Sequence, residues 1–76
     1  MDQVSVGTWV KLIGFEPDEE EVFRILPEGE ANASENEIPS DSPLARALDG
    51  ARAGDRVKFY APAGEVELKI LEVGRL

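Results

Sequence analysis

The chain has 76 residues and a mass of 8.3 kDa, which is enough for one small domain. It contains no cysteine and no histidine, which excludes a disulfide scaffold, a thiolate zinc site and catalysis by a cysteine or histidine. The formal net charge of −8 disfavours direct binding to nucleic acid, because the phosphates would be repelled. No apolar run is long enough to span a membrane and no signal peptide opens the chain, so we expect a soluble, cytoplasmic protein.

The negative charge is concentrated in one part of the chain. Residues 16–41 contain ten acidic residues and one arginine, a net charge of −9. Solvated turns and a solvated sheet edge account for this pattern, and an acidic face directed at a basic partner is the alternative. Residues 18–21 are consecutive acids in a turn without the spacing of an EF-hand, so they cannot all face one ion. We therefore expect no metal site and no cofactor.

The N-terminal third of the chain has the alternation of a β-hairpin. Residues 4–12 are predicted to form a strand, because Val6, Val10 and Leu12 fall at even positions and would share one face. A turn is predicted at residues 16–20 and a second strand at residues 21–26. Residues 27–42 are rich in Pro, Gly, Asn, Ser and Glu and are predicted to be a long irregular connection, which in a compact domain is often functional.

One short helix and a second hairpin follow. Ser42 is a good N-cap, Pro43 suits the first helical position, and Leu44 and Leu48 share a face of the predicted helix, which Gly50 can close. Two further strands are predicted at residues 56–60 and 66–70. The element order β-β-loop-α-β-β predicts an α+β domain with an antiparallel sheet and one short helix packed on it.

Two further groups of residues have more than one interpretation. A basic patch for RNA or phosphate is one reading of Arg46, Arg52, Arg56 and Lys58, but their acidic neighbours favour ordinary surface pairing. The aromatic residues would either line a pocket like that of a prolyl isomerase or belong to the core or to a partner-facing surface. We favour the second interpretation. These residues are Trp9, Phe15, Phe23, Phe59 and Tyr60.

Several sequence segments, in this order and spacing, resemble the C-terminal domain of the bacterial transcript-cleavage factors GreA and GreB. Residues 40–48 read Ser-Asp-Ser-Pro-Leu-Ala-Arg-Ala-Leu, and Gly-Asp at 54–55 and Pro-Ala-Gly-Glu at 62–65 follow. Upstream, Phe-Arg-Ile-Leu at 23–26 and Glu-Ala-Asn at 30–32 are similar to a family strand and turn. The resemblance extends over almost the whole chain.

The resemblance implies a fold, a partner and a docking site. The fold would be FKBP-like, a twisted antiparallel sheet around a short helix. The partner would be RNA polymerase, bound at the rim of its secondary channel through the tip of a coiled coil of the β′ subunit. The family's Asp-Ser-Pro docking segment corresponds here to Asp41, Ser42 and Pro43, with Leu44 and Arg46 beside it. Asp41 would accept hydrogen bonds from a basic residue of the partner.

The sequence also departs from the family pattern. Family members carry an N-terminal coiled coil whose tip acids help hold the polymerase magnesium for transcript cleavage, and no heptad pattern occurs here. We therefore expect residues 1–76 to form a single domain without that coiled coil, which binds without catalysing cleavage. Asp49 replaces a usually apolar residue and Pro39 a usual serine, and both flank the predicted helix.

Three hypotheses for function follow. The first is a polymerase-docking module that modulates elongation or competes with full-length factors. The second keeps the fold with another role, as in the Rnk-type regulators that share this domain, or with a different protein partner. The third is an FKBP-like prolyl isomerase, which we favour least. The periodicity leaves the oligomeric state open, because an edge strand can pair with a second copy.

Overall fold

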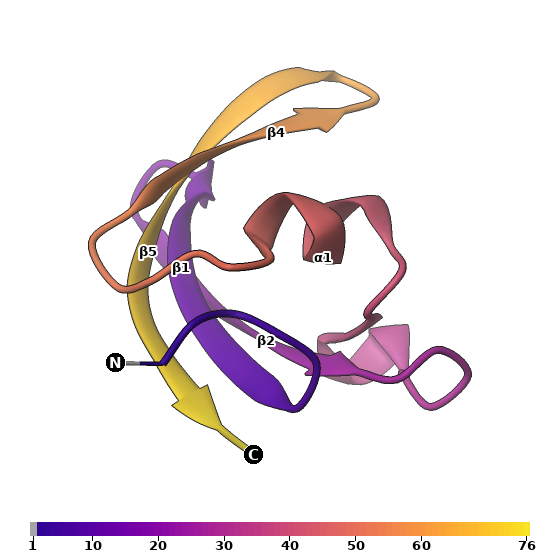
Figure 1. Cartoon of the computed structure of the whole chain (residues 1–76). Helices are drawn as coiled ribbons and strands as arrows, with labels where there is room; N and C mark the ends of the chain where they lie inside the picture. The colour runs from indigo at the N-terminus through magenta and orange to yellow at the C-terminus, as the bar shows by residue number, and fades with distance from the viewer. Residues whose placement is uncertain (1) are drawn as a thin grey trace.

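The fold is a curled sheet wrapped around one short helix (Figure 1). The computed structural model describes residues 2–76. In chain order the elements are β1 (Thr8–Glu16), β2 (Glu19–Leu26), the 3-10 helix η1 (Ala33–Glu35), β3 (Glu37–Pro39), α1 (Pro43–Leu48), β4 (Arg56–Ala61) and β5 (Gly64–Arg75). The strands form one sheet in the order β3-β2-β1-β5-β4. The predicted α+β class is confirmed, and the curled sheet around a helix is consistent with the FKBP-like fold.

Strand β1 lies at the centre of the sheet and begins at Thr8 rather than at the predicted Val4. The preceding residues form a turn, in which the Thr8 hydroxyl donates to the Ser5 carbonyl at 2.7 Å and Gly7 has a φ of 88°. Glycine adopts this φ without the steric penalty that a side chain would add. Val4 lies outside the sheet but is buried, and its N–H donates to the Ala51 carbonyl at 2.8 Å.

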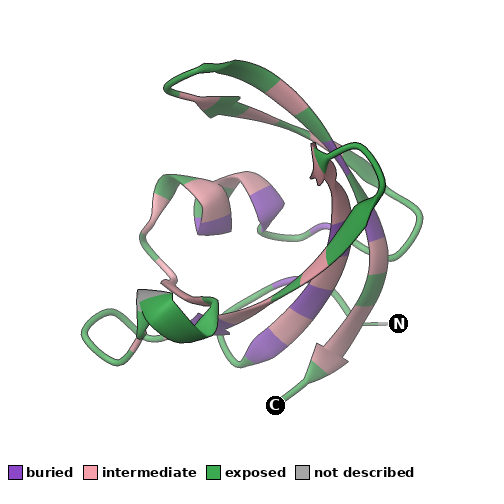
Figure 2. Cartoon of the chain, turned by 180° about the vertical axis from the view of Figure 1, so that it is seen from behind, coloured by how far each residue is buried: buried purple, intermediate pink, exposed green. Residues whose placement is uncertain are grey.

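The core lies between the concave face of the sheet and α1 (Figure 2). Successive side chains on a strand point to opposite faces, so every second residue is buried in the first half of β1 and in the middle of β5, while the residues between them face outward. The buried apolar residues are Val4, Val10, Leu12, Ile25, Ala45, Leu48, Ala51, Leu68 and Ile70. This cluster fixes α1 in the hollow of the sheet.

Two register shifts in the pairing of β1 with its neighbours help to curl the sheet. The register of β1 shifts against β2 between Ile13 and Glu16, and against β5 between Lys11 and Leu12. A bulge bends its strand and increases the local twist. The hollow that holds α1 follows from this curvature together with the normal twist of the sheet.

The predicted irregular connection at residues 27–42 contains η1 and the additional strand β3. Strand β3 runs parallel to β2, which makes the sheet mixed rather than wholly antiparallel. The pairing is flanked by backbone hydrogen bonds from Arg24 N to Asn36 O at 3.0 Å and from Ser40 N to Leu26 O at 2.9 Å. A strand of three residues is too short to show an alternating pattern, so periodicity could not have predicted it.

Helix α1 has six residues and lies inside the curled sheet (Figure 1). Its buried residues, Ala45 and Leu48, face the core, and Leu44 packs against the edge of that core. No helix within residues 2–76 is long and apolar enough to cross a membrane.

Candidate partner-binding site

The predicted docking residues lie in one continuous stretch, which we call the helix-start segment (residues 41–46). It begins two residues after the end of β3 and includes the first turn of α1. The Ser42 N–H donates to the Pro39 carbonyl at 2.9 Å, and the Arg46 N–H donates to the Ser42 carbonyl at 3.0 Å. The segment is therefore bonded to the end of the sheet on one side and to the helix on the other.

Ser42 caps α1 as the sequence predicts. Its backbone is extended, with φ −69° and ψ 155°, and its hydroxyl accepts a hydrogen bond from the Ala45 N–H at 3.2 Å. Pro43 occupies the first helical position, where its missing N–H has no partner to lose and its fixed φ already suits the helix. The cap and the proline together hold the backbone of the helix-start segment in one conformation.

Replacing Ser42 with alanine tests the strength of this cap. The Ser42→Ala variant is expected to lose about 1 kcal/mol of unfolding free energy, because the Ala45 N–H loses its acceptor. Urea unfolding followed by circular dichroism measures the loss. Ser5→Ala is the matched control, since the exposed Ser5 engages Thr8 through its backbone atoms, and it should change stability by less than about 0.5 kcal/mol. Equal losses in the two variants would show that the cap contributes nothing specific.

The helix-start segment divides into supporting and exposed side chains. Ser42 and Leu44 are half-buried, the first as the cap and the second against the core. Asp41, Pro43 and Arg46 are exposed. The structure thus brings the five predicted residues together, with three of them available on the surface and two of them holding that surface in place.

The two charged side chains of the helix-start segment are unpaired within the described part of the chain, whereas several charged side chains on the sheet form ion pairs. On the outer face of the sheet, Lys11 lies 3.4 Å from Glu72, and Arg24 lies 3.1 Å from Glu37, each measured between side-chain N and O. Asp41 and Arg46 form no ion pair and no side-chain hydrogen bond within residues 2–76. Their hydrogen-bonding groups are therefore free to contact a partner at no cost in internal contacts.

The two residues that depart from the family pattern, Pro39 and Asp49, lie before and after α1. Pro39 ends β3 at the edge of the sheet, where its lack of an N–H is tolerated, and its carbonyl accepts from Ser42. Asp49 is the exposed C-cap residue of α1.

The aromatic residues do not form one pocket. Phe15 packs edge-to-face on Phe23 and on Phe59, with ring centroids 6.1 Å apart in each pair, and all three lie against the core. Trp9 and Tyr60 alternate with inward-facing neighbours and lie on the outer face of the sheet. This division agrees with the reading of these residues as core and surface.

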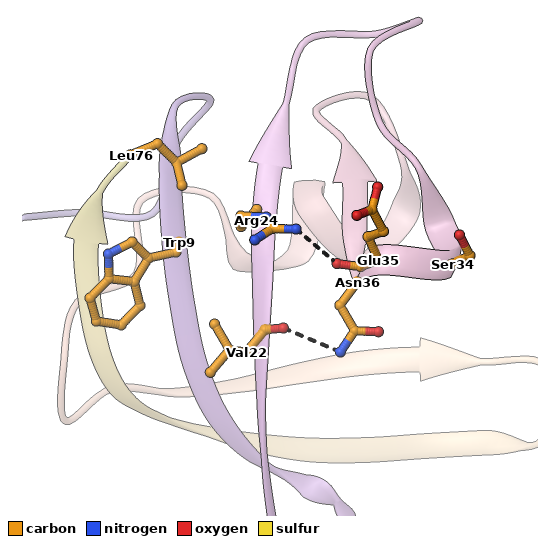
Figure 3. Close-up of a pocket in the computed structure, with 7 residues that line it drawn as sticks. All are labelled: Trp9, Val22, Arg24, Ser34, Glu35, Asn36 and Leu76. Carbon is orange, nitrogen blue, oxygen red and sulfur yellow. Dashed lines mark hydrogen bonds between the residues drawn. The ribbon is translucent and has the colours of Figure 1, made fainter.

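Sequence reasoning missed a pocket on the outer face of the sheet (Figure 3). It has a volume of about 600 Å³. Its lining residues are Trp9, Val22, Arg24, Ser34, Glu35, Asn36 and Leu76. Alternation in the sequence indicates that Trp9 and Val22 lie on the outer face, because each stands between residues that face the core. It could not reveal that η1 forms one side of the pocket.

Comparison with known proteins agrees with the resemblance that these segments suggest. The profile of the family described as "Transcription elongation factor, GreA/GreB, C-term" matches residues 1–75. The transcription elongation factor GreA of Nitrosococcus oceani is 42% identical over 72 residues, which is 95% of this chain and 46% of that protein. GreA of Thermoanaerobacter pseudethanolicus is 41% identical over 73 residues, covering 96% of this chain and 46% of that protein.

A solved structure agrees with the fold. The crystal structure of GreA factor homolog 1 of Thermus thermophilus superposes with a TM-score of 0.80 at 25% identity, and the match covers 96% of this chain and 49% of that chain. The chain spans about half the length of the curated relatives it matches. With a family profile that covers residues 1–75, the chain belongs to the GreA/GreB C-terminal domain family.

Proposed function

We propose that this domain binds RNA polymerase at the rim of the secondary channel and there modulates transcription elongation. The contact would be between the helix-start segment and the coiled coil of the β′ subunit. Family membership supports the proposal, because the curated relatives are transcription elongation factors. The domain would act by binding, since its aromatic residues divide between the core and the outer face instead of lining one catalytic pocket.

One observation supports the choice of the helix-start segment as the surface that contacts polymerase. The helix-start segment presents Asp41, Pro43 and Arg46 to solvent on a backbone that is fixed at both ends. A surface that is already ordered loses little conformational entropy when a partner binds. A short ordered segment can therefore act as the centre of an interface, where a few residues supply most of the binding free energy.

Each exposed residue has a distinct role in the proposed contact. The Asp41 carboxylate accepts hydrogen bonds from a lysine or arginine of the coiled coil, and the Arg46 guanidinium donates to an acidic residue or a carbonyl. Pro43 supplies a rigid apolar surface between them. Ser42 and Leu44 act through the backbone that they hold, so their substitution would weaken binding by loosening the segment.

Measurement of polymerase binding tests the proposal. The chain is immobilised and the dissociation constant of core RNA polymerase is measured by surface plasmon resonance. Asp41→Asn is expected to weaken binding roughly 10- to 100-fold, because a charge-assisted hydrogen bond contributes about 1.5–3 kcal/mol. Arg46→Ala should weaken binding in the same direction.

Asp49→Asn is the matched control. It removes one negative charge from the other end of the same helix, so a general effect of net charge would change both variants equally. We expect Asp49→Asn to bind within about twofold of the parent chain, since an isolated exposed charge contributes about 0–1 kcal/mol. The absence of polymerase binding by the parent chain, or equal weakening by both variants, would contradict docking through the helix-start segment.

A further inference from the structure

The outer-face pocket (Trp9, Val22, Arg24, Ser34, Glu35, Asn36 and Leu76) lies on the side of the sheet that does not hold α1. Cross-strand pairing of Trp9 with Arg24 places two of these residues side by side. The helix-start segment contributes no residue to it. The pocket is therefore a second surface, and an inference about it does not rest on polymerase docking.

One wall of the pocket is apolar. The Trp9 indole covers Gly74 on the neighbouring strand, where an added Cβ would lie 2.5 Å from three indole atoms. A glycine opposite an aromatic residue allows the ring to lie flat on the backbone, which fixes its position. Val22 and Leu76 stand on the same side of the sheet as the indole (Figure 3) and are 42% and 59% exposed. This wall offers contact area for an aliphatic side chain.

The opposite wall is polar, and Nη2 of its arginine is already engaged. Nη2 of Arg24 donates to the Glu35 carbonyl at 3.2 Å and lies 3.1 Å from a carboxylate oxygen of Glu37. The Asn36 side chain donates to the Val22 carbonyl at 3.3 Å, which ties the residue that follows η1 to β2 (Figure 3). The positive charge in the pocket is thus compensated within the domain.

The charge of Glu35 is not compensated in the same way. Its carboxylate accepts a hydrogen bond from the Asn32 side chain at 3.1 Å and forms no ion pair with any cation of residues 2–76. At this wall the carboxylates of Glu35 and Glu37 outnumber the single guanidinium of Arg24. A phosphate or an acidic peptide would be repelled, whereas a lysine or arginine would be attracted.

We propose that this pocket binds a basic peptide segment of a partner protein through one aliphatic side chain. The aliphatic side chain lies against Trp9, Val22 and Leu76, and a neighbouring lysine or arginine pairs with Glu35. Apolar contact supplies most of the affinity, and the charge selects basic over acidic sequences. The domain would then contact two partners, or two parts of one partner, on opposite faces of the same sheet.

Trp9 reports on binding directly, because it is the one tryptophan of the chain. Fluorescence is measured while the peptide acetyl-Gly-Lys-Leu-Lys-Gly-amide is added to the full chain at up to millimolar concentration. We expect a saturable change in intensity or wavelength. The peptide with serine in place of leucine should bind at least about tenfold more weakly, because its apolar contact is lost. The peptide with glutamates in place of lysines should produce no saturable change.

Two variants locate the contact. Glu35→Gln should weaken binding of the lysine peptide roughly twofold to fivefold, as expected for one exposed ion pair. Glu65→Gln, on the outer face at the β4-β5 hairpin, is the matched control and should leave it unchanged. The proposal is overturned by any of three results: no saturable signal, equal binding of the acidic peptide, or equal weakening by the two variants. Asp41→Asn should bind the peptide normally, which separates this test from the test of polymerase docking.

Discussion

Replacing Gly14 with alanine is expected to lower the free energy of unfolding by roughly 2–6 kcal/mol. Gly14 has a φ of 145°, which side chains rarely adopt, and a Cβ there would overlap the Glu67 carbonyl oxygen and lie 3.0 Å from Leu68 Cδ2. Backbone strain accounts for about 1–3 kcal/mol and overpacking for about as much again. A domain of this size rarely has more than about 3–5 kcal/mol of stability, so a large share of the variant should be unfolded at room temperature.

Gly64→Ala separates the two contributions. Gly64 has a φ of 135°, close to that of Gly14, but no atom lies within 4 Å of the position of its Cβ. The control variant therefore carries the backbone strain without the clash and should lose only about 1–3 kcal/mol. Urea unfolding followed by Trp9 fluorescence measures both variants. Equal losses would show that the close approach of Gly14 to β5 is not what makes glycine necessary there.

Replacing Leu48 with alanine is expected to lower the free energy of unfolding by about 2–5 kcal/mol. Leu48 is 0% exposed and is one of two buried residues that attach α1 to the core. Its truncation leaves a cavity between the helix and the sheet, and the six-residue helix has little stability of its own. The proposed binding to polymerase should fall by the fraction of the chain that unfolds, because the helix-start segment depends on α1.

Leu76→Ala is the control for the loss of a leucine. Leu76 is 59% exposed, so its removal leaves no internal cavity and should change stability by less than about 0.5 kcal/mol. Urea unfolding of both variants, with circular dichroism and fluorescence as independent probes, measures the difference. A loss below about 1 kcal/mol in Leu48→Ala would contradict the role given to this residue in holding α1.

The sequence predicted most of the fold where its pattern was long enough. Both hairpins were predicted from alternation, and the start of α1 from the capping residues Ser42 and Pro43. Alternation gave the wrong start for β1, because Val4 is buried outside the sheet. Strand β3 could not be predicted, since its three residues pair with β2 through backbone atoms that carry no sequence signal.

The two surfaces differ in how far sequence can predict them. The helix-start segment is continuous, so its residues could be predicted together from one capping motif and one family resemblance. The outer-face pocket joins residues from β1, from β2, from η1 and from the end of the chain. Their proximity depends on the register that pairs Trp9 with Arg24 and on the parallel strand that brings η1 to β2.

Site-specific photocrosslinking to core RNA polymerase tests the central claim most directly. The chain has no cysteine, so one cysteine can carry a benzophenone label without competing reaction. Asp49→Cys places the label at the C-terminal end of α1, about 9 Å along the helix from Pro43 of the helix-start segment, without changing the residues of that segment. Lys58→Cys places the label on the outer face. We expect crosslinks to the β′ subunit from position 49, and a several-fold lower yield from position 58. Equal yields at the two positions, or crosslinks from position 49 to another subunit alone, would contradict docking on the β′ coiled coil.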